Sequence, residues 1–67
     1  MTCCVPVVIV GGRQKTYIAG AGSRRYAEHV CAALARDYRE VQLQQQEQGQ
    51  PERAECLGVW RDGRRVQ

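Results

Sequence analysis

The apolar run at residues 3–10 constrains the fold more than any other part of this 67-residue sequence. It is far shorter than the roughly 20 residues that a membrane-spanning helix needs. Its side chains are mostly β-branched and so favour the pleated conformation. Because residues 7–10 (Val-Val-Ile-Val) are apolar without alternation, both faces of this segment need cover. We therefore expect a strand over residues 4–10 inside a sheet, with Pro6 near its start.

Turn signals follow this run. Gly11 and Gly12 supply the positive φ angles of a tight turn, and residues 15–19 alternate as a second strand, which predicts a β-hairpin. The segment Gly20-Ala21-Gly22 then breaks the strand, and Ser23 is a favourable N-cap for a helix that begins at Arg24.

Apolar residues with the spacing of one helical face continue from there: Ala27, Val30, Cys31, Leu34, Tyr38 and Val41. Residues 40–46 either prolong this helix or alternate as a strand. A helix over residues 24–47 would be roughly 36 Å long at 1.5 Å per residue, which is too long for so small a domain to cover. We therefore expect the helix to end near Arg39 and a third strand to span residues 41–45.

The C-terminal third reads as a loop followed by a hairpin. Residues 48–52 are a loop by composition, and residues 55–60 form a fourth strand. Asp62-Gly63 is a type I′ turn signal, after which residues 64–67 fold back as a short last strand. The expected structure is a single α+β domain over residues 1–67: a small antiparallel sheet, ordered β-β-α-β-β, with one helix packed on one face.

The composition favours a binding protein over an enzyme. The chain has one His, one Ser and two Thr, and His29 and Cys31 project in different directions from a helix. We therefore expect neither catalysis nor a cofactor. Lys and Arg total 10 against 7 Asp and Glu, and this net charge of +3 permits an anionic partner without requiring one.

The four cysteines contain no C-x-x-C pair, so we expect no metal site. Cys31 and Cys56 are interpreted as small buried hydrophobic residues. The basic residues Arg13 and Lys15 follow the apolar run instead of preceding it, which argues against a signal peptide. We expect a cytoplasmic protein with no membrane partner.

Three groups of residues are candidates for binding. Ser23, Arg24 and Arg25 open the helix after a glycine-rich break, where free N–H groups favour an anion such as a phosphate. The helix runs back toward the first turn, so its end should bring Arg36 and Arg39 near Arg13 and Lys15. A second basic group, Arg61, Arg64 and Arg65, flanks the Asp62-Gly63 turn. Both basic groups suit either phosphates or acidic protein side chains.

Aromatic residues supply a further candidate surface. One helix covers only one face of a sheet, so Tyr17 or Trp60 is expected on the uncovered face, ringed by arginines, as at protein interfaces. The structural alternative is that Trp60 caps the core.

The order of the elements, together with the C-terminal residues Trp60, Asp62, Gly63, Arg64 and Arg65, resembles small phage-encoded anti-CRISPR-type inhibitors. The resemblance implies a non-enzymatic inhibitor that occludes a surface of a larger nucleic-acid-handling complex, such as a CRISPR effector. The alternative is a small nucleic-acid-binding protein that contacts phosphates through Arg24, Arg25, Arg61, Arg64 and Arg65. A homodimer that pairs strand edges or sheet faces is the third hypothesis.

Overall fold

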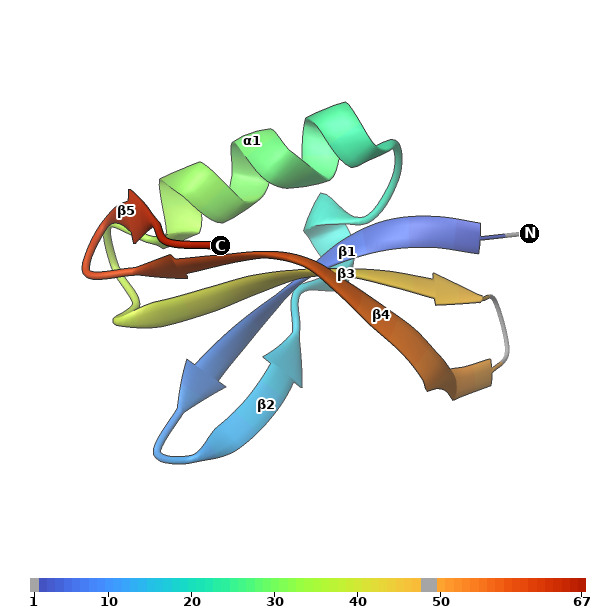
Figure 1. The fold of residues 1–67 in the computed structure, drawn as a ribbon, viewed down its shortest axis with the longest axis horizontal. Helices are drawn as coiled ribbons and strands as arrows, with labels where there is room; N and C mark the ends of the chain where they lie inside the picture. The colour runs from blue at the N-terminus through green and yellow to red at the C-terminus, as the bar shows by residue number, and fades with distance from the viewer. Residues whose placement is uncertain (1, 48–49) are drawn as a thin grey trace.

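The computed structural model describes residues 2–47 and 50–67, except for the side chains of residues 50–53. It consists of a five-stranded antiparallel sheet, in the order β2-β1-β3-β4-β5, and one α-helix (Figure 1). The elements are β1 (Thr2–Val10), β2 (Arg13–Thr16), the 3-10 turn η1 (Ile18–Gly20), α1 (Arg24–Leu34), β3 (Glu40–Glu47), β4 (Gln50–Arg61) and β5 (Arg64–Arg65). This arrangement confirms the expected α+β class with a helix packed on the sheet.

β1 lies inside the sheet, as its unbroken apolar run predicts. It pairs with β2 on one side and with β3 on the other, and Val5, Val7 and Val8 are at most 3% exposed. Neighbouring side chains of a strand point to opposite faces, so this burial shows that both faces of β1 are covered.

α1 packs on one face of the sheet, against β1 and β3 (Figure 1). The core between them contains Cys4, Val8, Ala27, Cys31, Ala35, Val41, Leu43 and Trp60. The register aligns Val8, Val41 and Trp60 across three strands, so this row faces the helix. The next row, Val7, Gln42 and Val59, faces away from it.

α1 begins at its predicted cap and ends earlier than expected. The Ser23 Oγ accepts a hydrogen bond from the Tyr26 N–H (3.2 Å) and so caps the first turn. The helix ends at Leu34, whose carbonyl accepts from the N–H groups of both Asp37 and Tyr38, instead of near Arg39. β3 then begins at Glu40, so residues 41–45 form a strand, as predicted, and do not extend the helix.

β2 is also shorter than the expected second strand over residues 15–19. It ends at Thr16: the Tyr17 N–H still donates to the Pro6 carbonyl of β1, but the chain then coils into η1. Gly20 lies against β1 and α1 so closely that a Cβ there would lie 2.7 Å from Val30 Cγ1 and 2.9 Å from Pro6 Cγ. Only glycine allows this approach without displacing its neighbours.

Two expectations about burial are corrected. Trp60 is 6% exposed and packs under α1, so it caps the core and does not lie on the uncovered face. Cys56 is exposed, whereas Cys31 is buried as expected. A register shift between Leu43 and Gln44 in the β3–β4 pairing changes the alternation of β4 just where Cys56 lies.

The burial of Trp60 predicts a large effect of its removal. Trp60→Ala should lower the free energy of unfolding by about 3–5 kcal/mol, because the change leaves a cavity under α1. Tyr17→Ala is the matched control. Because Tyr17 is 43% exposed, its truncation should lower the free energy of unfolding far less. Urea denaturation measures both, and an unchanged Trp60→Ala midpoint would contradict the core position of this residue.

Candidate functional site

Three connections of the chain meet at one end of the sheet: the 11–12 turn, the 35–39 loop and the 62–63 turn (Figure 1, left). We call this region the turn end. An open pocket of about 540 Å³ lies there. The residues that line the pocket are Ile9, Val10, Gly11, Gly12, Asp37, Tyr38, Arg39, Glu40, Arg61 and Asp62.

The local sequence fixes the shape of the turn end. Gly11 (φ 57°) and Gly12 (φ 79°) both have positive φ angles, as a two-residue turn between β1 and β2 requires. Asp62 (φ 52°) and Gly63 (φ 82°) repeat this geometry between β4 and β5, which confirms the Asp-Gly turn signal. The Asp62 N–H donates to the Arg39 carbonyl at 3.0 Å, so the last turn is bonded to the helix–strand loop.

The turn end brings together arginines that the sequence placed in two groups. Arg39 and Arg61 line the pocket itself, and Arg13, Arg36 and Arg64 belong to the three connections or directly adjoin them. The Arg61 Nε donates to the Glu40 Oε1 at 3.0 Å. Within the described part of the chain, Arg13, Arg36, Arg39 and Arg64 make no ion pair. Lys15 lies on β2, opposite Val8, and does not line the pocket.

A row of glutamine side chains on β3 supports the Glu40–Arg61 pair. The Gln46 Nε2 donates to the Gln44 Oε1 and the Gln44 Nε2 to the Gln42 Oε1, each at 3.2 Å. The Gln42 Nε2 then donates to the Glu40 Oε2 at 3.4 Å. These side chains project at i, i+2 spacing from the face opposite α1. The buried Gln44 therefore has both ends of its amide paired, and the row ends on the carboxylate that holds Arg61.

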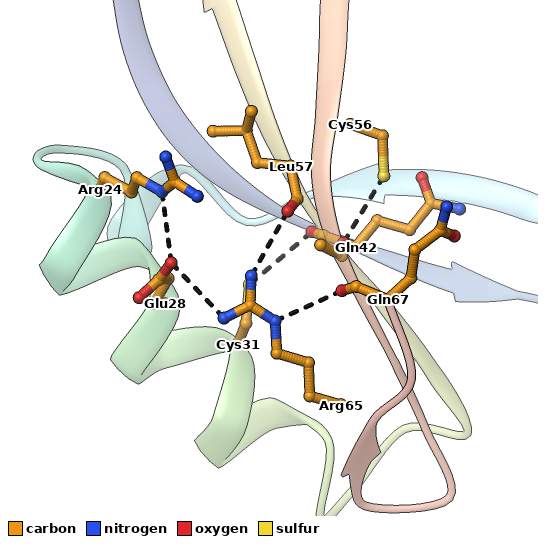
Figure 2. A network of polar contacts seen from close by, with 9 residues as sticks. Arg24, Glu28, Cys31, Gln42, Cys56, Leu57, Arg65 and Gln67 are labelled. Carbon is orange, nitrogen blue, oxygen red and sulfur yellow. Dashed lines mark hydrogen bonds and ion pairs between the residues drawn. The ribbon is translucent and has the colours of Figure 1, made fainter.

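Arg65 holds parts of the fold together instead of lying free at the surface (Figure 2). Its Nη1 lies 3.6 Å from the Glu28 Oε1, and its Nη2 donates to the Leu57 carbonyl at 3.4 Å. Its Nε donates to the Gln67 carbonyl at 3.3 Å. The Glu28 Oε1 also accepts a hydrogen bond from the Arg24 Nε at 3.3 Å, so a single carboxylate pairs with two of the candidate arginines.

Gly58 makes room for this arrangement. The Arg65 guanidinium lies 4.9 Å from the centre of the Trp60 ring, within the range of a cation–π contact. A Cβ on Gly58 would lie 3.0 Å from the Arg65 Nη2 and 3.2 Å from the Trp60 Cζ3. The glycine therefore allows the guanidinium and the indole to lie close to β4.

Two of the three anion-binding candidates at the start of α1 have partners within the chain. The Ser23 hydroxyl is used as the helix cap, and Arg24 is paired with Glu28. Arg25 is exposed. Tyr17 is exposed at the opposite end of β2 from the 11–12 turn.

Sequence reasoning missed Tyr38 as a surface residue of the turn end. The helical spacing assigned it to the apolar face of α1, but the helix ends at Leu34, and Tyr38 is 38% exposed at the pocket. The polar run of residues 36–40, broken only by this tyrosine, is the signal that places it in a loop.

The cysteines fall into two exposed and two buried thiols. Cys3 and Cys56 are exposed, and Cys4 and Cys31 are buried. Burial raises the pKa of Cys31 to about 12, an effect to which the nearby Glu28 carboxylate adds, while burial also raises the pKa of Cys4. Among the described residues, no group of three or more His, Cys, Asp or Glu side chains is placed to hold a metal ion.

No family model, curated protein or solved structure matches this chain. No helix in the described residues is long and apolar enough to cross a membrane.

The Arg65 contacts predict a contrast between two adjacent arginines. Arg65→Ala should lower the free energy of unfolding by roughly 1–2 kcal/mol, because it removes two hydrogen bonds, the ion pair with Glu28 and a cation–π contact. Arg64→Ala should change it by less than about 0.5 kcal/mol, as is usual for a surface substitution. Equal unfolding midpoints for the two variants would contradict the role given to Arg65.

The raised pKa of Cys31 predicts a loss of stability in alkali. The thiol has a higher pKa in the folded than in the unfolded chain, so its contribution is complete below about pH 9 and falls as the pH rises toward 12. The difference in unfolding free energy between wild type and Cys31→Ala should therefore shrink from pH 8 to pH 11 in urea titrations. A pH-independent difference would contradict this assignment.

Proposed function

We propose that this protein is a small non-enzymatic binding protein that uses its turn end to occlude an acidic surface of a larger protein. One observation carries the proposal: arginines that make no ion pair among the described residues come from three separate connections at one end of the sheet, and one of them, Arg39, lines the pocket there. Exposed arginine beside tyrosine and aliphatic side chains is typical of the residues that dominate protein interfaces.

The proposed contact surface differs from the one suggested by the sequence alone. It keeps Arg13, Arg36, Arg39, Arg61 and Arg64 and adds Tyr38. It omits Trp60, which is buried in the core, and Arg65, which is paired with Glu28. The net charge of +3 would also speed the encounter with an acidic partner.

The partner is proposed to be a nucleic-acid-handling complex. This part of the proposal rests on the resemblance to anti-CRISPR-type inhibitors, carried by the element order and the Trp60 to Arg65 segment. A bound chain would cover the surface that nucleic acid or a nuclease needs, and inhibition would be stoichiometric, since one bound copy blocks one surface.

Direct binding of nucleic acid is the second candidate function, because the same unpaired arginines could contact phosphates. The two functions differ in the affinity for free nucleic acid. A phosphate-binding protein would shift labelled DNA or RNA, with an affinity that falls steeply as salt is added. A protein that docks on another protein would not.

Charge reversal on the turn end tests the proposal. Arg36→Glu combined with Arg39→Glu should weaken binding to the purified partner at least tenfold, because both positions would then repel an acidic surface. Lys15→Glu combined with Arg25→Glu is the matched control, since it makes the same change in net charge away from the pocket. The partner is identified by affinity capture with mass spectrometry, and its dissociation constant is measured by calorimetry.

The outcomes separate the two functions. Equal weakening by both double variants would contradict a specific role of the turn end. A gel shift of labelled oligonucleotide that the Arg36/Arg39 variant abolishes would support nucleic-acid binding in place of protein docking.

A further inference from the structure

We infer that β2 is a docking edge for an extended acidic segment of another protein, which pairs with the sheet as an additional strand. The inference goes beyond the proposed function, because it concerns a strand edge and not the pocket of the turn end. β2 is the end strand of the order β2-β1-β3-β4-β5, and within the described residues only β1 pairs with it (Figure 1). All four of its residues are exposed.

The hairpin turn determines which backbone groups of β2 bond to β1. The 11–12 turn has two residues, so Val10 and Arg13, which flank it, exchange backbone hydrogen bonds. Bonded and non-bonded pairs then alternate along an antiparallel ladder. The Tyr17 N–H, four positions after Arg13, donates to the Pro6 carbonyl at 2.8 Å and so agrees with this alternation.

Gln14 and Thr16 are the residues of β2 whose backbone faces outward. Because they alternate with the bonded residues, their N–H and C=O groups point away from β1. No strand of the described chain lies on that side of β2. Such a row of unpaired groups is a template for strand addition, a recurring way in which proteins bind extended segments.

The side chains of β2 select the charge of the added strand. Arg13 and Lys15 project from the same face, because they lie two positions apart. Neither makes an ion pair in the described structure, and β2 contains no carboxylate. An antiparallel strand centred on Gln14 places its two flanking residues opposite Arg13 and Lys15. Cross-strand pairs of opposite charge stabilise a sheet, so the flanking residues that fit are Asp or Glu.

The same charges disfavour a second copy of this chain as the added strand. In an antiparallel ladder, outward-facing residues pair with outward-facing residues. Pairing Gln14 with Gln14 of a second copy would place Arg13 opposite Lys15, and pairing Gln14 with Thr16 would place Lys15 opposite Lys15. Like charges directly opposite each other destabilise a sheet. The edge therefore fits an acidic segment better than it fits itself.

The experiment titrates the full ¹⁵N-labelled protein with capped hexapeptides and follows its backbone amide resonances. The acidic peptide is Thr-Thr-Glu-Val-Glu-Thr, in which the valine pairs with Gln14 and the glutamates lie opposite Arg13 and Lys15. We expect it to shift the Gln14 and Thr16 amides in a saturable way and to slow their hydrogen exchange, because both gain a hydrogen bond. The same peptide with Lys in place of both Glu should bind at least about tenfold more weakly.

Backbone methylation of the peptide separates strand addition from simple charge attraction. N-methylation of the valine removes the N–H that donates to the Gln14 carbonyl, and should weaken binding at least about tenfold. N-methylation of the first glutamate is the matched control, since the N–H of that residue points away from β2. This control should leave the dissociation constant within about twofold of the unmodified peptide.

Two charge reversals tie the effect to β2. Lys15→Glu should weaken the acidic peptide at least about fivefold, because it places like charges opposite each other. Arg25→Glu makes the same change in net charge on α1 and should leave the binding unchanged. Both residues are exposed, so neither change disturbs the core. Equal weakening by the two variants would overturn the inference.

Three further outcomes also overturn the inference. If no peptide shifts the Gln14 and Thr16 amides, the edge takes no acidic strand. If the valine-methylated peptide binds as tightly as the unmodified one, charge attraction acts without an added strand. If these amides are protected in the free protein and it sediments as a dimer, a second copy pairs with the edge. None of these results decides the proposed function, which is tested by charge reversal at Arg36 and Arg39.

Discussion

The packing of one helix on one face of the sheet determines where everything else in this protein lies. α1 buries Ala27 and Cys31 against Val41 and Leu43, and Trp60 completes this core from β4. Arg65 secures the arrangement from β5 by joining Glu28 of the helix to the Leu57 carbonyl of β4. α1 is only 11 residues long and does not reach one end of the sheet, and the described residues form no second α-helix to cover the opposite face.

The two regions without a helix are stabilised in different ways. On the opposite face, the i, i+2 amide row of β3 satisfies the buried Gln44, and Val5, Val7 and Val59 are nonetheless buried. At the turn end, one backbone hydrogen bond and one ion pair hold the chain: the Asp62 N–H bonds the last turn to the α1–β3 loop, and the Arg61–Glu40 side-chain pair joins β4 to β3. The glutamine row and this ion pair share Glu40, so the polar face and the turn end form one connected network.

Local signals in the sequence predicted most of the fold. The unbroken apolar run placed β1 inside the sheet, and the Gly11-Gly12 turn, the Ser23 cap and the Asp62-Gly63 turn lie where their chemistry requires. The end of α1 was missed, because Tyr38 and Val41 continue the helical spacing past Leu34. The sequence does not decide on which face of the sheet Trp60 lies, because Val59 and Trp60 are both apolar. The register shift at Leu43 and Gln44 is also not visible in the sequence of either strand.

The candidate site was predictable only in part, for a related reason. The sequence does not show which arginines form ion pairs within the fold. Arg61 pairs with Glu40 and Arg65 with Glu28, and in both pairs the two residues lie far apart in the chain. Arg24, by contrast, pairs with Glu28 at i, i+4 and was open to prediction. The two basic groups lie at the same end of the sheet because the α1–β3 loop is bonded to the last turn. No local sequence pattern predicts that bond.

The backbone bond between the last turn and the α1–β3 loop should hold the turn end as a fixed surface before any partner binds. Hydrogen exchange of the Asp62 amide in the free protein tests it most directly, because this N–H donates to the Arg39 carbonyl and to no strand partner. We expect the Asp62 amide to be protected to a degree similar to the Val59 amide of β4, which bonds to the Gln67 carbonyl. Exchange of Asp62 at the rate of an unprotected loop amide, while Val59 stays protected, would contradict it.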